Sequence, residues 1–491
     1  MNLSPEEAAF YDKWNQELSS GRITPDQLKT FFASYSDIQF PTAPPSVCVT
    51  PLTILYCDGM IDKVQLNEYM TNVCQYIGRS VSQQKAAPEN TAALPPIEVV
   101  SSFAAMLDKL FTGCLIIFME GSSWFWSVQL AKIPQRTLEE SNTEISIKGP
   151  KDAFTEELST NLSLIRKRLP TGLLLSEGFT VGSISKTKIA LLYLQHKADP
   201  KMLAKVRKRL ITFQTECIVG SGQLEQWLSD RTFSVFPLMD YIGRPDFVIE
   251  TLLRGRFALI VDGSPMVLIG PSNFLELLKT PEDAHFPYFF VIFQRAVRLI
   301  GFSLSILLPG FYLAISSVNL DQIPIQLIAT VVLSREGVPL PLAFEAFLLL
   351  FLFELLKEAG LRLPRAVGQT IGIVGGLIIG DALIRAGLAS PTLLVVMAIS
   401  AVSSFTLVNQ SLSGTVSLLR VLIMIPSALL GVYGFFIAQL GILIYLCQLE
   451  TFGLPYMEPV SSLRFKEWLA AFLYNPFRRK NFTAPMLKRK R

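Results

Sequence analysis

Hydrophobic and polar positions divide the chain near residue 290. Charged residues are spread from Met1 to about Pro287, whereas long apolar runs with few charges dominate from Leu299 to Leu449. A helix needs about 20 apolar residues to cross the hydrocarbon layer of a bilayer. The pattern therefore predicts an α/β soluble N-terminal domain of two similar subdomains, argued below, followed by an α-helical transmembrane domain.

The first segment, residues 1–47, reads as two helices and a linker. Ser4 and Thr24 have the character of N-cap residues, and each is followed by a proline at the first helical position. The first helix should end near Ser20, and the proline-rich sequence FPTAPPS follows the second. We expect this segment to be a tethered extension without an activity of its own, as terminal segments commonly are.

Two later segments, residues 48–145 and 146–290, repeat one order of elements. In both, an apolar strand containing Leu-Tyr is followed by an aspartate (Asp62 and Asp199) and an amphipathic helix. Both then end in a hairpin: CLIIFMEG with SSWFWSVQLAKI in the first, and GRFALIVDGSPMVLIGP in the second. Short apolar runs bounded by turn residues are typical of strands. The repeat predicts two similar α/β subdomains.

The transmembrane domain, residues 291–455, contains several apolar runs. Ile323–Ser334 is too short to cross, and we expect it to be interfacial or re-entrant. The runs long enough to form membrane helices are Leu299–Ser317, Val338–Leu356, Val367–Leu388, Pro391–Asn409 and Leu418–Leu449, the last broken at Pro426.

Positive charge predicts how these runs are oriented. Lys357, Arg362 and Arg365 follow the second run, and residues 456–491 form a basic tail. The polar N-terminus indicates no signal peptide. By the positive-inside rule the N-terminal domain, this loop and the tail lie on the cytoplasmic side. The number of crossings should then be even: four, with at least one long segment bent or re-entrant, or alternatively six.

The run Val367–Leu388 carries two distinct faces. Close helix packing is favoured by glycines at every fourth position: Gly368, Gly372, Gly376 and Gly380. The neighbouring face has the same spacing: Gln369, Ile373, Leu377, Asp381 and Arg385. An apolar constriction with polar ends is how a dewetting gate is built, so this face is the candidate pore lining. The alternative is that all of these residues are buried helix contacts.

Two glutamates lie within the second membrane run. An ionisable residue there is costly and is therefore a functional candidate. Glu345 and Glu354 are nine positions apart, so at about 100° per residue they point to opposite sides of a helix. Glu354 lies beside Lys357 and is expected to pair locally. Glu345 is a candidate for an ion pathway or gate, or for a hydrogen bond between helices.

The residue composition limits the kinds of functional site that the chain can form. The six cysteines lack CxxC spacing and there are only two histidines, so we expect no metal centre. No nucleophile–base arrangement and no nucleotide loop stands out, so we expect neither an enzyme nor a cofactor, and no nucleic-acid partner. A basic helix face at Lys201, Lys205, Lys208 and Arg209 is either solvated or in contact with anionic lipid headgroups.

Four stretches resemble a known family. They are SIKGPKDAFTEELSTNLSLIRKRL (with Gly149, Pro150, Phe154, Glu156, Asn161, Arg166 and Arg168), FPLMDYIGRPD with LLRGRFALIVDGSPMVLIGP, the Val338–Leu388 region, and LLGVYGFFIAQLGILIYL with FGLPYMEP. From about Cys48 to Pro459 the chain resembles the A subunits of GerA-type nutrient germinant receptors of spore-forming bacteria. That family usually has Thr-Glu-Arg-Pro-Asp at Ile242–Asp246; the glutamate is missing here, while Arg244, Pro245 and Asp246 remain.

The resemblance implies a protein of the inner spore membrane whose N-terminal domain faces the core. It implies two partners, a transporter-like B subunit and a lipoprotein C subunit, and a homo-oligomer in membrane lipid that acts as a nutrient-gated cation channel. The motif residues would then serve the fold and assembly. Two alternatives remain: a non-conducting assembly scaffold of the receptor, and a paralogous sporulation membrane protein linked to dipicolinic acid transport.

Overall fold

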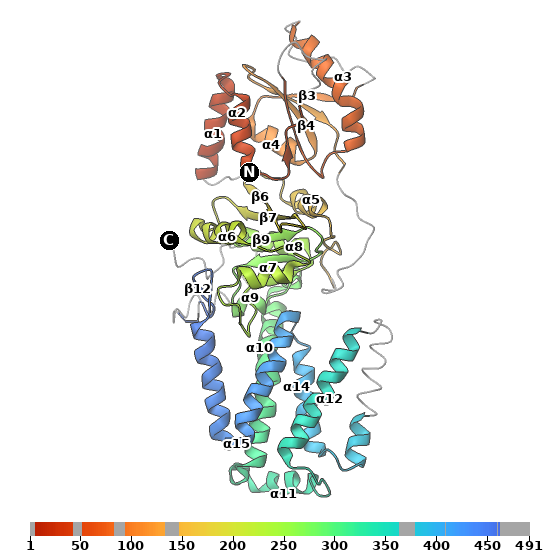
Figure 1. Ribbon diagram of the computed structural model, residues 1–491, viewed down its shortest axis with the longest axis vertical. Coiled ribbons are helices and arrows are strands. Elements are labelled where there is room, and N and C mark those ends of the chain that lie inside the picture. The colour runs from red at the N-terminus through yellow and green to blue at the C-terminus, as the bar shows by residue number, and fades with distance from the viewer. Residues whose placement is uncertain are drawn as a thin grey trace. The chain divides into compact units, whose positions relative to one another are not determined.

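The computed structural model describes residues 5–42, 52–82, 94–132, 147–362, 379–407, 409–458 and 460–461. These residues form two compact units. Among the described residues, the amino-terminal unit contains the chain up to Ser229 together with Met239–Pro271, and the helical unit contains Asp230–Leu238 together with the chain from Ser272 to Ser461. Figure 1 labels the elements of both units, which are described one at a time below.

The amino-terminal unit contains two five-stranded antiparallel sheets with the same strand order. The first has the order β1-β2-β4-β5-β3 and the second β6-β7-β9-β10-β8. Numbered within each sheet, both orders are 1-2-4-5-3, so the predicted repeat is confirmed. The strands of the first sheet are β1 (Ile38–Gln39), β2 (Leu52–Cys57), β3 (Ile97–Val100), β4 (Cys114–Met119) and β5 (Phe125–Gln129). Those of the second are β6 (Leu174–Val181), β7 (Thr187–Leu194), β8 (Asp240–Ile242), β9 (Phe257–Val261) and β10 (Val267–Gly270).

Helices cover these sheets at equivalent places in the two copies. Asp62 accepts a hydrogen bond from the N–H of Val64 at the start of α3, and Asp199 accepts one from Lys201 at the start of α6. The two aspartates that mark the repeat are therefore helix caps, which explains their equivalent positions. The helices are α3 (Lys63–Ser82) and α4 (Phe103–Phe111) in the first copy, and α5 (Leu158–Arg168), α6 (Pro200–Thr212), α7 (Ser221–Leu228) and α8 (Pro245–Leu253) in the second.

The N-terminal segment is built into this unit and is not a tethered extension. It forms α1 (Pro5–Ser19), α2 (Pro25–Phe31), the short η1 (Phe32–Ser34) and β1. Thr24 caps α2 as predicted. The Trp14 ring stacks on Phe103 at 4.7 Å, and Asn15 accepts a hydrogen bond from the N–H of Phe103 at the start of α4. The segment therefore completes the first subdomain.

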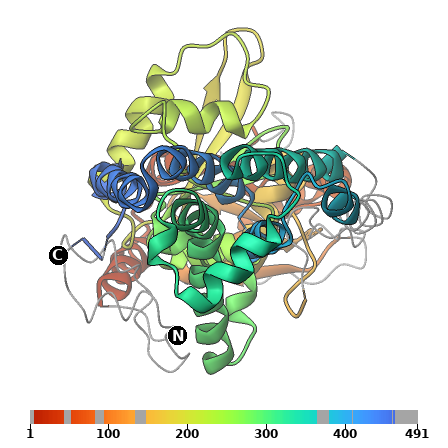
Figure 2. The same ribbon diagram turned by 90° about the horizontal axis from the view of Figure 1, so that it is seen from below.

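The helical unit begins with α9 (Phe274–Leu277) and η2 (Pro281–Ala284) and then consists of longer helices. They are α10 (Tyr288–Ser317), α11 (Ile325–Ser334), α12 (Leu342–Arg362), α14 (Pro391–Ser404) and α15 (Gln410–Gln448), with η3 (Leu320–Gln322) between α10 and α11. Among the described helices, Tyr288–Ser317 and Ser411–Gln448 are long and apolar enough to cross a membrane. The short α11 runs crosswise at the end of the unit (Figure 1), as an interfacial helix would. Figure 2 views most helices end-on, with α10 beside α15.

The predicted break of α15 at Pro426 is wrong; the helix reverses at Gly431. Gly431 has φ 63° and ψ −140°, whereas Pro426 lies inside the first arm. Proline removes one N–H but keeps a helical φ, while this combination of angles is accessible essentially to glycine alone. The two arms of α15 run in opposite directions in Figure 1. The second arm ends at a small hairpin, β11 (Glu450–Thr451) and β12 (Leu454–Pro455).

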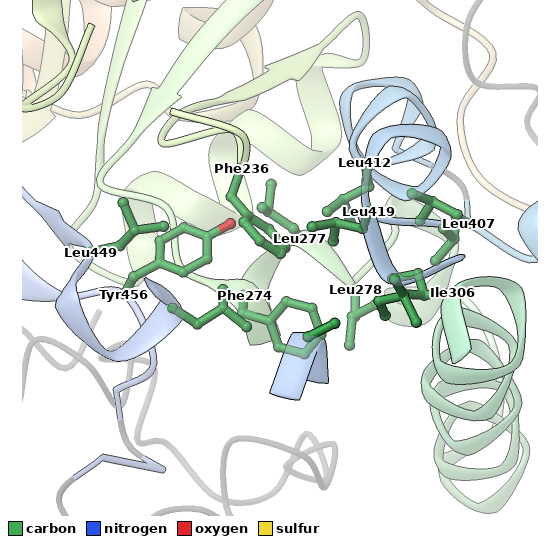
Figure 3. Packing of buried hydrophobic residues seen from close by; sticks show 14 of the residues in the cluster. Phe236, Phe274, Leu277, Leu278, Ile306, Leu407, Leu412, Leu419, Leu449 and Tyr456 are labelled. Atoms are coloured by element: carbon green, nitrogen blue, oxygen red, sulfur yellow. The ribbon is translucent and has the colours of Figure 1, made fainter. Parts of the chain in front are cut away.

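An apolar cluster closes one end of the helical unit (Figure 3). The Tyr456 ring is fully buried in it and its hydroxyl donates to the carbonyl of Pro237 at 3.0 Å. Thr415 on α15 donates to the carbonyl of Val235, and the amide of Asn273 donates to the carbonyl of Glu458. Segments far apart in the sequence, including the FGLPYMEP motif, therefore form one compact end. The labelled members are Phe236, Phe274, Leu277, Leu278, Ile306, Leu407, Leu412, Leu419, Leu449 and Tyr456.

Candidate functional site

A proline in α10 creates a polar site where helices meet. Pro309 has no N–H, so the carbonyl of Ser305, four residues earlier, lacks its normal partner within the helix. Two side chains from other helices replace it. Arg420 Nε of α15 donates to this carbonyl at 2.9 Å, and Ser400 Oγ of α14 donates at 2.8 Å. A freed backbone carbonyl inside a membrane is normally satisfied in this way.

The same arginine links this carbonyl to α12. Arg420 Nη1 lies 3.7 Å from Glu354 Oε1, and Ser417 Oγ of α15 donates to that oxygen at 2.6 Å. Lys357 Nζ lies 3.8 Å from Glu354 Oε2. Four helices, α10, α12, α14 and α15, therefore converge on one charged cluster. We call Ser305, Glu354, Ser400, Ser417 and Arg420 the polar node.

Burial differs across the polar node. Ser305 and Ser400 are fully buried and Arg420 is 4% exposed by side chain, whereas the Glu354 side chain is 36% exposed. The node therefore has an enclosed half at α10 and α14 and an accessible half at α12. Ionisable groups inside membrane helices are costly and usually serve a pathway or a structural contact that compensates the cost. Here the Glu354 carboxylate and the Ser305 carbonyl together compensate the charge of the Arg420 guanidinium.

Close helix contact around the polar node depends on glycines in α10. A Cβ at Gly301 would lie 2.2 Å from Thr406 Oγ1, and a Cβ at Gly310 would lie 2.5 Å from Ile423 Cγ2. Neither distance is possible for a real side chain, so only glycine permits this approach. Small-residue packing thus occurs at α10, a position that the spacing of glycines in the sequence did not indicate.

The other acid predicted as a functional candidate, Glu345 of α12, lies in a separate and fully enclosed site. Its Oε1 accepts hydrogen bonds from the backbone N–H and the Oγ of Ser390, each at 2.5 Å. Ser390 is the N-cap residue of α14, so a carboxylate stands at the amino-terminal end of that helix, where negative charge is favoured. Arg335 Nε lies 3.9 Å from Glu345 Oε2. This arrangement is a hydrogen-bonded tie between α12 and α14.

A third charged cluster precedes α10 and anchors its first turns. Asp283 accepts from Arg295 Nε at 2.8 Å and from Arg298 Nη1 at 2.9 Å. Burial alone would raise the pKa of the Asp283 carboxyl, but the two guanidinium groups outweigh it and hold the pKa below its ordinary value. The pairing extends α10 back to Tyr288, although the apolar run begins only at Leu299.

Comparison with known proteins now identifies the family. The family model described as Bacillus/Clostridium GerA spore germination protein matches residues 26–485. The chain belongs to the GerA spore germination family. It is 40% identical to spore germination protein XA of Bacillus anthracis, over 92% of this chain and 93% of that protein. It is 35% identical to spore germination protein KA of Bacillus subtilis (strain 168), over 84% of this chain and 76% of that protein.

A solved structure also matches this GerA chain. It is the N-terminal domain of the A subunit of the Bacillus megaterium spore germinant receptor GerK3, 27% identical with a TM-score of 0.36. The match covers 51% of this chain and 93% of that domain. The family match and the two spore germination proteins support a role in a multi-subunit, membrane-associated spore germinant receptor.

The motif residues of this GerA chain lie in the amino-terminal unit, apart from the polar node. Asn161 is fully buried, and its side chain exchanges hydrogen bonds with the backbone of Thr155 at 2.7 and 2.6 Å. Arg244 is buried and contacts both oxygens of Asp246, at 3.1 and 2.6 Å, with Pro245 opening α8. The other motif residues are Gly149 and Pro150 before α5, buried Phe154, exposed Glu156, and Arg168, which pairs with Asp152.

Arg166 forms the most enclosed contact of the amino-terminal unit. Its side chain is fully buried, and its Nε and Nη2 donate to the Asp37 carboxylate at 2.8 and 3.2 Å. Ser176 of β6 donates to the same carboxylate at 2.5 Å, and Cys57 of β2 donates at 3.5 Å. Asp37 lies beside β1, so this contact joins the N-terminal segment, the first sheet and the second sheet.

The predicted pore face lies mostly outside the described residues. Gly368, Gln369, Gly372, Ile373, Gly376 and Leu377 all fall between 363 and 378. Asp381 and Arg385 are described; they are exposed and pair at 2.8 Å as their spacing predicts. A Cβ at Gly380 would lie 3.6 Å from Leu394, an ordinary packing distance. The role of this face as a lining therefore stays a prediction.

Sequence reasoning missed the centre of the polar node. Glu354 pairs with Lys357 as expected, but Arg420, Ser400 and Ser417 were not singled out. A signal was present, because Arg420 is an isolated charge near the start of the apolar run Leu418–Leu449. No sequence rule pairs it with Ser305, however, since that contact depends on how α10 and α15 pack.

Proposed function

We propose that this chain is the membrane subunit of a spore germinant receptor that oligomerises into a nutrient-gated cation channel. The observation that carries the proposal is the group of ionisable side chains, Glu345, Glu354 and Arg420, held inside apolar helices. Ionisable groups inside apolar helices are by default candidates for an ion pathway or its gate. Membership of the GerA family supplies the link to germination.

The proposed assembly follows from the family and from the charges of the chain. We propose that the receptor contains a transporter-like B subunit and a lipoprotein C subunit in the inner spore membrane. The basic residues 456–491 favour a cytoplasmic amino-terminal unit and tail. Because α15 reverses at Gly431, its two arms support six crossings, which keeps the count even.

The lining in this proposal is the face that contains Ile373 and Leu377. It follows α12 in the chain, and α12 carries both intramembrane glutamates. An apolar ring bounded by polar groups blocks ions by excluding water until the ring widens. Nutrient binding elsewhere in the receptor would then act by moving this segment.

Ion release from vesicles tests the proposal. The purified receptor, with its B and C subunits, is reconstituted into potassium-loaded lipid vesicles and exposed to a rich nutrient mixture. We expect potassium release that depends on nutrient, and release without nutrient when Ile373 or Leu377 is replaced by alanine. Ile371→Ala is the control, because on a helix this residue would lie about 200° around the axis from Ile373. No release under any condition would favour a non-conducting scaffold.

A further inference from the structure

The two halves of α12 are held in different ways. In the first half, Leu342, Glu345, Ala346, Leu349 and Leu350 are buried. The four apolar residues among them pack with residues of α10, α14 and α15 in one cluster. Between Phe351 and Gly360, by contrast, no residue is buried. In this second half the partly buried Phe353 packs against the same cluster. Packing therefore fixes the first half of the helix, whereas the second half contributes no buried side chain to it.

The first half has a carboxylate anchor that water does not reach. Glu345 is 0% exposed and accepts two short hydrogen bonds from Ser390 at the start of α14. Breaking them would leave a buried charge and a helix terminus without partners, which is strongly unfavourable. This end of α12 is therefore suited to be a fixed pivot.

The second half is held to α15 by the polar node. Glu354 accepts one hydrogen bond from Ser417, while its ion pairs with Arg420 and Lys357 are long, at 3.7 and 3.8 Å. The Glu354 side chain is also 36% exposed. Because Glu354 is partly exposed and both ion pairs are long, they hold it less firmly than the enclosed hydrogen bonds hold Glu345. Arg420 has a second partner, the Ser305 carbonyl at 2.9 Å, which does not involve α12.

We propose that residues Phe351–Gly360 form a movable arm of α12, which pivots about the Glu345 half and is tethered to α15 by Glu354. In the sequence the arm precedes residues 363–378, which contain Ile373 and Leu377 of the predicted lining. The mechanical part of this inference stands on the contacts of α12; its link to gating rests on the proposed channel function. The contact of Glu354 with α15 holds the arm in its resting position.

Distance measurements between spin labels test the arm directly. Labels are placed at Leu355 on the arm and Leu418 on α15, which are 48% and 63% exposed. Cys48, Cys217 and Cys447 are replaced by serine in the full chain in lipid. We expect Glu354→Ala and Ser417→Ala to broaden and lengthen the distance distribution. Ala359→Ser changes an exposed side chain further along the same arm and should leave the distribution as in the parent protein.

The outcomes separate the arm from the channel. If the distance distributions of Glu354→Ala and Ser417→Ala both match that of the parent protein, the movable arm is contradicted. This holds whatever the potassium-release experiment shows. Because Ser417→Ala removes only a hydroxyl, it keeps the test valid if Glu354→Ala fails to fold. Spores that carry Ser417→Ala should germinate at a nutrient concentration roughly three- to tenfold lower, the factor expected for one lost interhelical hydrogen bond. A higher requirement at normal receptor abundance would contradict a tether that holds the resting state.

Discussion

At the scale of single residues, Gly431 decides the direction of the second arm of α15. Its φ of 63° reverses α15, and Asn319, just after α10, accepts a hydrogen bond from the N–H of Val432 at 3.0 Å. That bond satisfies a donor that the start of the second arm would otherwise leave open. One glycine and one asparagine thus replace the turn that a loop would provide.

Replacing Gly431 by alanine should destabilise the helical unit. The added Cβ would lie 2.1 Å from Asn319 Oδ1, and a non-glycine residue is strained at this backbone conformation. We expect the free energy of unfolding to fall by about 2 kcal/mol or more. Thermal unfolding of the full chain in detergent measures the change.

Gly441→Ala is the matched control for this substitution. Gly441 lies in the second arm of the same helix, and a Cβ there meets nothing within 4 Å. Alanine is a better helix former than glycine, so this variant should unfold at the same or a slightly higher temperature. Equal losses in the two variants would show that the reversal does not depend on Gly431.

At the scale of elements, α10 is the helix around which the others are placed. Gly301 and Gly310 let α14 and α15 approach, and the Ser305 carbonyl freed by Pro309 binds a side chain from each of them. Van der Waals packing and interhelical hydrogen bonds are the main forces that associate helices in a membrane, where the hydrophobic effect between helices is small. The contacts of α10 supply both.

Ser400→Ala should therefore weaken the helical unit more than Ser303→Ala. Ser400 Oγ reaches across to the carbonyl of Ser305 on another helix, whereas Ser303 Oγ donates to Leu299 of its own helix. We expect a loss of about 1 kcal/mol for the first and a smaller loss for the second. Thermal unfolding in detergent compares the two. Indistinguishable melting temperatures would mean that Arg420 alone satisfies the carbonyl.

At the scale of the whole molecule, the chain repeats one α/β plan and then changes to helices. The two copies are joined by the segment that precedes β1, since Asp37 meets Arg166 and Ser176 of the second copy and Cys57 of the first. Burial raises the pKa of the Asp37 carboxyl, but Arg166 and the hydrogen bonds outweigh it, so the pKa lies below its ordinary value.

Acid should weaken the amino-terminal unit through Asp37. A carboxyl whose folded pKa is depressed stabilises the fold fully above its unfolded pKa, about 3.9, and loses that contribution as pH falls through the folded value. We expect stability at pH 7 to be independent of this group's titration and to decline below about pH 4. Unfolding of the parent chain and of Asp37→Asn, followed from pH 7 to pH 2, measures the difference.

In Asp37→Asn the loss of stability below about pH 4 should be smaller than in the parent chain. The variant should nevertheless be less stable at pH 7, because Arg166 loses a charged partner. Asp152→Asn is the control, because Asp152 pairs with Arg168 at a site where both side chains are more than a quarter exposed. Its acid profile should follow that of the parent chain. A parallel decline in Asp37→Asn would contradict the assignment of this pH dependence to Asp37.

Local pattern accounts for the elements that were predicted correctly. Apolar runs located β2, β7 and both hairpins, but not β1, β3, β6 or β8. Thr24 and Asp199 located helix starts, and the order of elements revealed the repeat. Each of these signals depends on residues close together in the chain. The candidate site was predicted only in part: Glu345 and Glu354 stood out because charge is rare in apolar runs, but their partners Ser390, Ser417 and Arg420 lie on other helices.

By itself the sequence determined the two α/β copies, the apolar helices and the family, because periodicity, caps and motifs are written in neighbouring residues. Only the tertiary structure decided that the N-terminal segment joins both copies, that α15 reverses at Gly431, and that Arg420 binds the carbonyl freed by Pro309. The physical reason is the same in each case. A backbone angle or a missing donor becomes significant only when another segment is packed against it, and which segment does so depends on the whole fold.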